Sequence, residues 1–405
     1  YRLLQGDVGS GKTIVAGLAA LNAVEAGYQT VLMAPTEILA EQHFNTLTKL
    51  FADWPIRLGL LTRGSHKLSG DDDSMSANKL KQTIATGEVD IVIGTHAVLQ
   101  TSVQFKKLGL VIVDEQHRFG VEQRGSLTES ESIIPHFLSL TATPIPRSLA
   151  LTIFGELDIS VLKNLPAGRQ PISTKIIVSQ ERNKMYELVR REVATGNRVF
   201  IVCPLIEESD NLGVRAATAE YERLQKNIFP HLKLGLLHGR LKSVEKSTVM
   251  EKFKNGTTPI LVTTSVIEVG VDVPEATVMI VEGAERFGIA QLHQFRGRVG
   301  RSDRASYCLL CTDSQNPLAT KRLQALTNYS NGFDLAEFDL KQRGPGNLLG
   351  ELQSGWGNLR FAELADANLL KLVRQASDLI LKMDSQLNHY PTLINKIKKT
   401  NVHLE

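Results

Sequence analysis

Gly6-Asp7-Val8-Gly9-Ser10-Gly11-Lys12-Thr13 follows a short apolar segment and precedes a helical pattern, which is the context of a phosphate-binding loop. Its glycines allow backbone N–H groups to wrap around phosphates, and a helix that begins at Lys12 presents the positive end of its dipole. We expect Lys12 to reach the outer phosphates of ATP and Thr13 to hold Mg²⁺. A simple glycine-rich turn is the alternative. The stretch therefore predicts an α/β domain that binds ATP and Mg²⁺.

Short apolar runs alternate with helix-length segments on both sides of a connector at residues 164–171, which carries proline and glycine and has no periodicity of its own. Continuous apolar runs are typical of parallel strands that are buried on both faces. The runs before the connector cover residues 30–33, 90–93, 110–113 and 137–140, and those after it cover 175–178, 199–203, 234–237, 260–262 and 277–281. The sequence therefore predicts an α/β fold with two P-loop NTPase lobes, residues 1–163 and 173–317, joined by a linker at 164–172.

The strand pattern stops near Leu318, and residues 318–405 form a third predicted region. We expect helices on either side of the glycine-rich segment Arg343-Gly344-Pro345-Gly346-Asn347-Leu348-Leu349-Gly350. A long amphipathic stretch follows this pair, with apolar residues near a 3.6-residue period, so this last helix should dock on a lobe. Those residues are Phe361, Leu364, Ala365, Leu369, Val373, Ile380 and Met383.

Two carboxylates, Asp114 and Glu115, follow the apolar run at 110–113. They should emerge at the carboxyl edge of the sheet beside the phosphate loop. Asp114 is then expected to anchor Mg²⁺, and Glu115 to orient and deprotonate the attacking water. His117, two residues later, is either a structural histidine or a relay between the γ-phosphate and the segment at residues 141–144.

The second lobe carries Gln294-Phe295-Arg296-Gly297-Arg298-Val299-Gly300-Arg301. The spacing predicts Arg298 and Arg301 on one helix face, as arginine fingers that neutralise charge on the transferred phosphoryl group. We place Gln294 among the catalytic residues and Arg296 as the arginine least suited to a finger. The alternative is a basic patch that binds nucleic acid. A site divided between lobes would convert each hydrolysis cycle into a lobe movement.

The composition indicates the general class of protein but, unlike the motifs, does not indicate its chemistry. The chain of 405 residues has 42% hydrophobic residues, a net charge of +3 and three cysteines, which fits a globular protein of a reducing compartment. Cys308 and Cys311 fall on a predicted strand at 305–311, where an odd spacing points them to opposite faces, so a zinc or redox pair is disfavoured. We find no run long enough to span a membrane and no signal peptide.

The motifs, in order, resemble those of helicase superfamily 2, and the resemblance covers nearly the whole chain. They read GDVGSGKT, APTEILA, GTHA, DEQH, TATPIPR, HGR, TTSVIEVGVDVP and QFRGRVGR. Longer stretches resemble the RecG helicases in particular: VDEQHRFGVEQR, KNLPAGRQPI, IVCPLIEESD, ERFGIAQLHQFRGRVGRSD and GFDLAEFDLKQRGPGNLLGELQSG. Transcription-repair coupling factors are similar too, but they typically have DEEH where this chain has DEQH.

The resemblance implies two RecA-like lobes that hydrolyse ATP and translocate on branched double-stranded DNA, such as replication forks and Holliday junctions, in recombination and repair. It implies a bacterial cytoplasmic monomer without a membrane partner, for which single-strand-binding protein is a candidate partner. Thr36, Thr95 and Thr264 would lie along the DNA, where hydroxyl groups can bond phosphate oxygens. Gly270 and Asp272 would lie near the ATP cleft.

Residues 331–355 resemble the family's translocation motif, with Arg343, Gly344, Gly346 and Gln353 as the matching positions. A structural turn is the alternative. Glu351-Leu352 departs from the family, which usually has a small polar residue and an arginine there. The family's wedge domain and adenine-binding glutamine segment lie outside this chain, so we expect the chain alone to hydrolyse ATP weakly and to unwind branched DNA poorly.

The residues alone leave three other functions possible. One is a repair translocase that pushes another protein along DNA. A second is a non-catalytic clamp gated by ATP, against which Lys12, Glu115 and Arg301 argue together. The third is an RNA helicase, because backbone contacts do not distinguish RNA from DNA.

Overall fold

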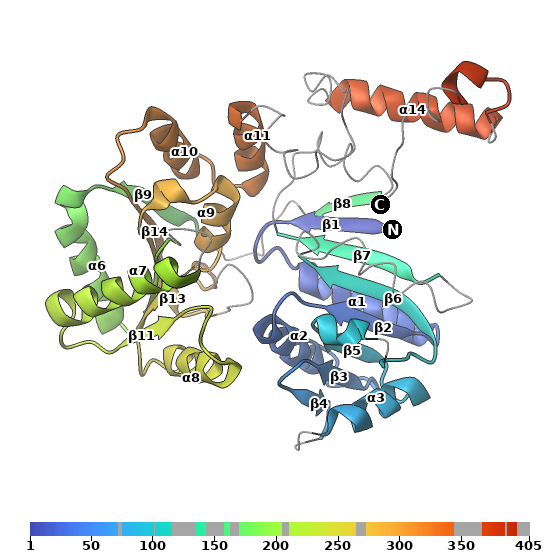
Figure 1. The fold of residues 1–405 in the computed structure, drawn as a ribbon, viewed down its shortest axis with the longest axis horizontal. Coiled ribbons are helices and arrows are strands. Elements are labelled where there is room, and N and C mark those ends of the chain that lie inside the picture. Colours follow the sequence, from blue (N-terminus) through green and yellow to red (C-terminus); the bar gives the residue numbers. More distant parts are fainter. Residues whose placement is uncertain are drawn as a thin grey trace. The chain divides into compact units, whose positions relative to one another are not determined.

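A computed structural model describes residues 1–71, 75–100, 102–115, 134–142, 158–162, 170–204, 210–264, 273–343, 367–384 and 387–394. The chain divides into two compact units. The first comprises residues 1–143 with 159–332, and the second comprises 144–158 with 333–405. The first unit contains two β-sheets with helices around them, which confirms the predicted two-lobe α/β architecture (Figure 1).

The first sheet has the strand order β4-β3-β5-β2-β6-β7-β1-β8. Its pairs from β3 through β1 are parallel, whereas β4 runs antiparallel to β3. The strands are β1 Arg2–Gly6, β2 Gln29–Met33, β3 Leu58–Leu61, β4 His66–Leu68, β5 Ile91–Gly94, β6 Leu108–Asp114, β7 His136–Thr141 and β8 Asp158–Leu162. The helices are α1 Lys12–Glu25, α2 Glu37–Leu50 and α3 Ala77–Thr86, with a 3₁₀ turn at His96–Leu99.

Strand β2 shows why continuous apolar runs form the middle of this sheet. All five of its residues are buried. Leu32 belongs to the core cluster that includes residues of α1 and α2, whereas Val31 and Met33 belong to the cluster that includes residues of α3. Successive side chains of a strand point to opposite faces, so a strand covered on both faces must be apolar at every position.

Gln29, at the edge of this core, is the polar exception. Its side chain is buried, and its amide nitrogen donates to the carbonyl oxygens of Ile84 (3.0 Å) and Val89 (2.8 Å). Its amide oxygen accepts from the backbone N–H groups of Lys106 (2.7 Å) and Lys107 (3.2 Å). One side chain thus satisfies four backbone groups, from α3 and from the connections before β5 and β6. Buried polar groups are normally paired in this way.

Replacing Gln29 by Leu should lower the free energy of unfolding by about 2–4 kcal/mol, because buried backbone groups would lose their partners. Denaturant unfolding measures this change. The matched control is Gln82→Leu on the exposed side of α3, which should change stability by about 0.5 kcal/mol or less. Equal effects of the two substitutions would contradict the role given to the Gln29 network.

The second sheet is parallel throughout, with the order β11-β12-β10-β13-β14-β9. Its strands are β9 Ile172–Ile177, β10 Arg198–Val202, β11 Leu234–Leu237, β12 Ile260–Thr263, β13 Ala276–Val281 and β14 Ser306–Cys311. Its helices are α6 Arg182–Ala194, α7 Asp210–Arg223, α8 Ser243–Lys254, α9 Ile289–Arg296 and α10 Pro317–Asn328, with short helical turns at Ser179–Glu181, Leu224–Ile228 and Ala284–Arg286. The chain passes from the first sheet to the second between Leu162 and Ile172.

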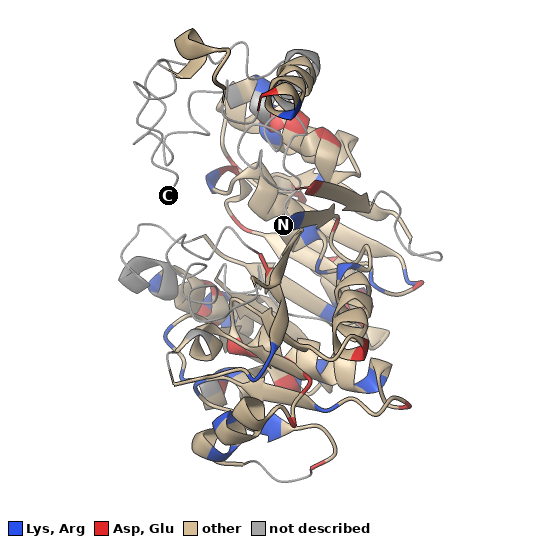
Figure 2. Cartoon of the chain, turned by 90° about the vertical axis from the view of Figure 1, so that its right-hand side faces the viewer, with Lys and Arg blue, Asp and Glu red and all other residues tan. Residues whose placement is uncertain are grey.

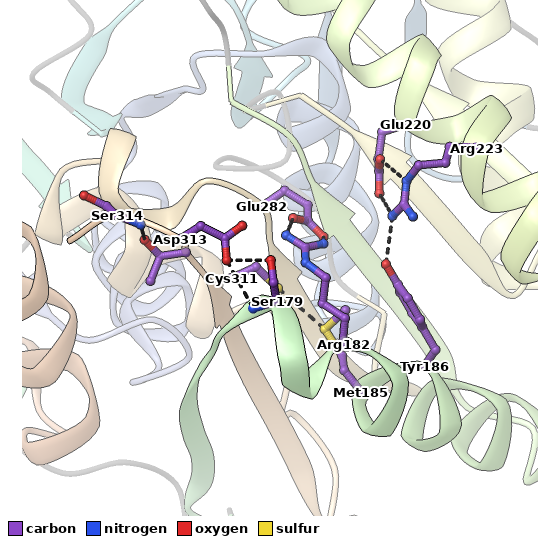
Figure 3. Close-up of polar contacts among 11 residues, drawn as sticks. Ser179, Arg182, Met185, Tyr186, Glu220, Arg223, Glu282, Cys311, Asp313 and Ser314 are labelled. Atoms are coloured by element: carbon purple, nitrogen blue, oxygen red, sulfur yellow. Dashed lines mark hydrogen bonds and ion pairs between the residues drawn. The ribbon is translucent and has the colours of Figure 1, made fainter.

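A polar network ties α6 to the carboxyl ends of the second sheet (Figure 3). Arg182 donates to both carboxylate oxygens of Glu282, just after β13, at 2.9 and 2.8 Å. Ser179 donates from its hydroxyl to Asp313, just after β14, at 2.7 Å. Arg223 of α7 donates to the Tyr186 hydroxyl at 2.7 Å. The Arg182 and Arg223 contacts are partly buried, and the Ser179 contact is exposed. The contacts of Arg182 and Ser179 hold the residues that follow β13 and β14, and that of Arg223 joins α7 to α6, so we assign all three a structural role.

Two of the three cysteines lie on the strand that the sequence predicted at residues 305–311. Cys308 and Cys311 lie on β14, and both are buried free thiols, as is Cys203. Burial raises the pKa of Cys308 to about 12, so that its reactive thiolate form is scarce near neutral pH. Among the described residues, no group of His, Cys, Asp and Glu is arranged to hold a metal ion.

The second unit contains α11 Gly332–Arg343, apart from its first residue, and α14 Ala367–Met383. Helix α11 precedes the glycine-rich segment, as predicted, and α14 lies within the predicted amphipathic stretch. The second helix of the predicted pair falls in residues 344–366, which lie outside the described part of the chain. Helix α10, which we grouped with the C-terminal region, belongs to the first unit and contacts β9 and α9. No helix in the described part of the chain combines the length and the apolar character of a membrane span.

Candidate active site

The phosphate loop connects β1, which ends at Gly6, to α1, which begins at Lys12. Gly9 and Gly11 have φ angles of 77° and 92°, in the left-handed region that favours glycine. A Cβ at Gly6 would lie 2.5 Å from the Ser10 hydroxyl oxygen. The backbone conformation therefore requires glycine at positions 9 and 11, whereas Gly6 leaves room for the Ser10 side chain.

The loop presents hydrogen-bond donors of the kind that a triphosphate needs. Gly11, at the N-cap of α1, supplies no side-chain cap, and the buried Ser10 hydroxyl has no hydrogen-bond partner among the described residues. Lys12 donates from Nζ to the carbonyl oxygens of Gly6 (2.8 Å) and Asp7 (2.9 Å). Burial lowers the pKa of Lys12, and nearby carboxylates, led by Asp114, oppose the shift. The backbone donors, hydroxyl and ammonium fit an anionic nucleotide.

Thr13 and Asp114 are the residues that would hold Mg²⁺. Thr13 lies in the first turn of α1, and Asp114 is the buried last residue of β6. A hydroxyl and a carboxylate are oxygen ligands, the type that Mg²⁺ prefers. One oxygen of Asp114, Oδ2, is 2.9 Å from Nε2 of His43 in α2.

Glu115 sits in a strained and desolvated position. Its φ of 55° is unusual for a residue with a side chain, and its N–H donates to Leu140 (2.9 Å). Its Oε1 accepts from the N–H of Ala142 at 3.4 Å. Burial, followed by the negative charge of Asp114, raises the pKa of Glu115 to about 7, while Lys12 opposes the shift. A carboxylate with such a pKa is suited to accept a proton near neutral pH.

The predicted helix face for the two arginines is wrong. Helix α9 ends at Arg296, and Gly297 forms its C-cap, so Arg298 and Arg301 lie beyond the helix. Gly300 has a φ of 70°, which a helix cannot contain. Arg298 is buried, and Arg301 is partly buried and donates from Nε to the carbonyl oxygen of Gly297 at 3.3 Å.

Within the first unit, this arginine segment contacts the phosphate loop. His293 of α9 forms an ion-pair contact with Asp7, with 3.2 Å between Nε2 and Oδ1. A Cβ at Gly297 would lie 2.7 Å from that of Val8, so glycine allows the two segments to approach closely. Burial is the main cause of the lowered pKa of Lys12, and the positive charge of Arg298 adds to it. Arg298 is therefore within electrostatic range of the phosphate loop.

Three family models match successive parts of the chain. "DEAD/DEAH box helicase" matches residues 2–152, and "Helicase conserved C-terminal domain" matches residues 180–303. "ATP-dependent DNA helicase RecG, domain 3, C-terminal" matches residues 328–403. The order of the three models is the order of the two lobes and the C-terminal region.

Curated relatives cover almost the whole chain. The "ATP-dependent DNA helicase RecG" of Synechocystis sp. is 50% identical over 398 residues, which are 98% of this chain and 47% of the relative. The protein of the same name from Bacillus subtilis is 44% identical over 99% of this chain and 58% of the relative. The chain belongs to the RecG helicase family. It spans about half the length of the curated relatives that it matches.

Solved structures agree with this assignment. A structure described as RecG bound to a three-way DNA junction superposes with a TM-score of 0.73 at 44% identity, covering 92% of this chain and 47% of that chain. Mss116p bound to single-stranded RNA and AMP-PNP has a TM-score of 0.60 at 16% identity, covering 96% of this chain and 87% of that chain. The second similarity concerns the fold alone, which is two RecA-like lobes.

The three threonines assigned to DNA lie at the carboxyl ends of strands. Thr36 is the N-cap of α2, where its hydroxyl accepts from the N–H of Leu39 at 3.3 Å. Thr95 follows β5, and the buried Thr264 follows β12. Their contact with DNA stays a prediction of the family resemblance.

Several predicted site residues lie outside the described part of the chain. They are His117, Gly270, Asp272, Gly344, Gly346 and Gln353. Arg343 is the last residue of α11, and its side chain also lies outside the described part. Gln294 is described and is buried in α9.

Arg296 has a role that the sequence did not reveal. Its buried guanidinium donates to the carbonyl oxygens of Leu326, Tyr329 and Ser330, each at 2.8 Å. These carbonyls lie at and just beyond the C-terminal end of α10. Arg296 therefore fixes the end of α10 to the helix that precedes Arg298, which explains why it is not available as a finger.

Proposed function

We propose that the chain is an ATP-dependent motor that acts on branched DNA, in recombination and repair. The observation that carries the proposal is that Glu115 and Arg298 both lie within electrostatic range of Lys12 in the phosphate loop. An ammonium for the phosphates, a carboxylate of near-neutral pKa and an arginine are the groups that phosphoryl transfer to water requires. Membership of the RecG family supports DNA as the track.

We assign the following roles to the residues of the site. The loop from Gly6 to Thr13 binds the triphosphate, and Thr13 and Asp114 hold Mg²⁺, which when bound neutralises phosphate charge. Glu115 orients the attacking water and accepts its proton. Arg298 and Arg301 stabilise the charge on the transferred phosphoryl group, and Gln294 is proposed to act with them. His117 is proposed as a relay between the γ-phosphate and the segment at residues 141–144. Gly270 and Asp272 complete the cleft.

Branched DNA is the proposed substrate because a relative that is 44% identical is described as bound to a three-way DNA junction. Thr36, Thr95 and Thr264 are proposed to contact its phosphates. Arg343, Gly344, Gly346 and Gln353 are proposed to couple the ATP cycle to movement. Basic and acidic residues are interspersed on the side drawn in Figure 2, so charge by itself does not mark a DNA path there.

We propose the cellular location of the protein from its family and from its cysteines. Buried free thiols suit a reducing cytoplasm, and the relatives are bacterial. A monomeric state and contact with single-strand-binding protein are proposed from the resemblance alone.

Steady-state ATP hydrolysis tests the function directly. The rate is measured without nucleic acid and with a three-way DNA junction, a linear duplex of the same length or single-stranded RNA. We expect a low basal rate that the junction raises most, and loss of both basal and stimulated rates in Lys12→Ala. Greater stimulation by RNA would overturn the DNA assignment, and hydrolysis that persists in Lys12→Ala would overturn the ATP site.

A further inference from the structure

Helix α2 connects two parts of the proposed machinery. It begins after Thr36, a proposed DNA contact, and carries His43 seven residues further on. Seven residues are about two helical turns, or roughly 10 Å along the axis, so the two residues lie on nearly the same face. Nε2 of His43 lies 2.9 Å from Oδ2 of Asp114, the carboxylate assigned to Mg²⁺.

Both partners of this contact are held in place. His43 is 4% exposed and Asp114 is 9% exposed. Helix α2 buries Phe44 and Leu47 in the same core cluster as Ile112, which lies on β6 two residues before Asp114. The helix and the strand are therefore packed together. The histidine and the carboxylate meet inside the lobe, where both are little exposed to water.

The chemistry of the two groups decides which of them donates the hydrogen bond. An ionised carboxylate can only accept, so Nε2 of His43 must donate, and both the neutral Nε2–H tautomer and the imidazolium can do so. The bond occupies one oxygen of Asp114 and leaves the other for a metal shell. Groups that hydrogen-bond a metal ligand fix its orientation, and their loss commonly weakens metal binding by about 10- to 100-fold.

We propose that His43 is a positioning residue for Asp114, which orients this carboxylate for the magnesium–nucleotide complex and ties it to the helix that Thr36 caps. The inference rests on the proposed function, since it takes Asp114 as a magnesium site. His43 does not touch nucleotide or metal, and its effect passes through Asp114.

Two substitutions separate positioning from packing. His43→Phe keeps an aromatic ring in the buried site but cannot donate, whereas His43→Gln retains an amide N–H donor. Thermal unfolding checks that each variant folds. His43→Met, which is flexible and also lacks a donor, replaces His43→Phe if the latter does not fold. His136→Phe, an exposed histidine at the start of β7, is the matched control.

The measurement is binding of a fluorescent ADP analogue to the 405-residue chain during a titration with Mg²⁺ alone, which needs no hydrolysis. We expect His43→Phe to need at least about tenfold more Mg²⁺ than wild type for half-maximal nucleotide binding. Its affinity for the nucleotide in EDTA should stay within about twofold of wild type. His43→Gln should recover most of the loss, and His136→Phe should titrate like wild type.

The outcomes separate the inference from the proposed function. If wild type shows Mg²⁺-dependent binding and a folded His43→Phe titrates identically, His43 is a packing residue and the inference is wrong. A loss that His43→Gln does not recover would also overturn a role that depends on the donated hydrogen bond. If wild type binds the nucleotide without any effect of Mg²⁺, the magnesium site of the proposed function fails first.

Discussion

Arg298→Ala should lower kcat for ATP hydrolysis by about 10³-fold or more and should leave ADP binding within about threefold. An arginine that contacts the phosphoryl group only as charge develops contributes to the transition state and little to the ground state. Arg298 is buried, and its charge already reaches Lys12 and Glu115. Single-turnover hydrolysis at saturating Mg²⁺ and ATP measures the effect.

Two controls make the Arg298 result specific. Arg286→Ala removes an exposed arginine of the same lobe and should change kcat by no more than about twofold. Thermal unfolding must show that Arg298→Ala is folded, because a buried side chain is removed. If the folded variant stays within about tenfold of wild type while Arg301→Ala loses activity, the finger is Arg301 and the assignment to Arg298 is refuted.

Glu115→Gln should have two opposite effects: kcat falls by about 10²- to 10⁴-fold, and the metal-free protein becomes more stable at alkaline pH. The loss of rate follows from removing the proton acceptor. The gain in stability follows from removing the ionisable group, because burial and the charge of Asp114 raise the pKa of Glu115 to about 7. Gln keeps the shape and the acceptor oxygen that Ala142 uses.

The sign of the pH dependence comes from the raised pKa. The folded protein holds a proton on Glu115 up to about pH 7, whereas the unfolded chain releases it near 4.5. The wild type therefore loses stability as pH rises between these values, by at most about 3 kcal/mol. Glu115→Gln should raise the unfolding midpoint in EDTA at pH 8 and leave it almost unchanged at pH 5.

The matched control is Glu187→Gln, an exposed glutamate in α6, whose midpoint should follow wild type at both values of pH. A uniform shift of Glu115→Gln at pH 5 and pH 8 would show that the ionisation of Glu115 does not cause the change in stability. A variant that hydrolyses ATP at the wild-type rate would remove Glu115 from the mechanism.

Much of the fold could be predicted because its signals are local. The runs at 30–33 and 234–237 lie within β2 and coincide with β11, since strands buried on both faces must be apolar throughout. β4 was not predicted because three residues carry too little pattern. β3 was missed although its sequence, Leu-Gly-Leu-Leu, is the same as that of the predicted β11. β8 was missed because most of its residues are partly exposed or exposed, so it lacks a continuous apolar run.

The sequence by itself determined the phosphate loop, the two α/β lobes and the family, because each depends on neighbouring residues or on the order of motifs. Only the tertiary structure decided which side chains meet. His43 and Asp114 are 71 residues apart, and Arg296 bonds carbonyls 30 to 34 residues away. The tertiary structure also decided that α9 ends before Arg298 and that the pKa of Glu115 is raised. Such contacts depend on strand order, helix register and burial, which packing sets over the whole lobe and no single motif contains.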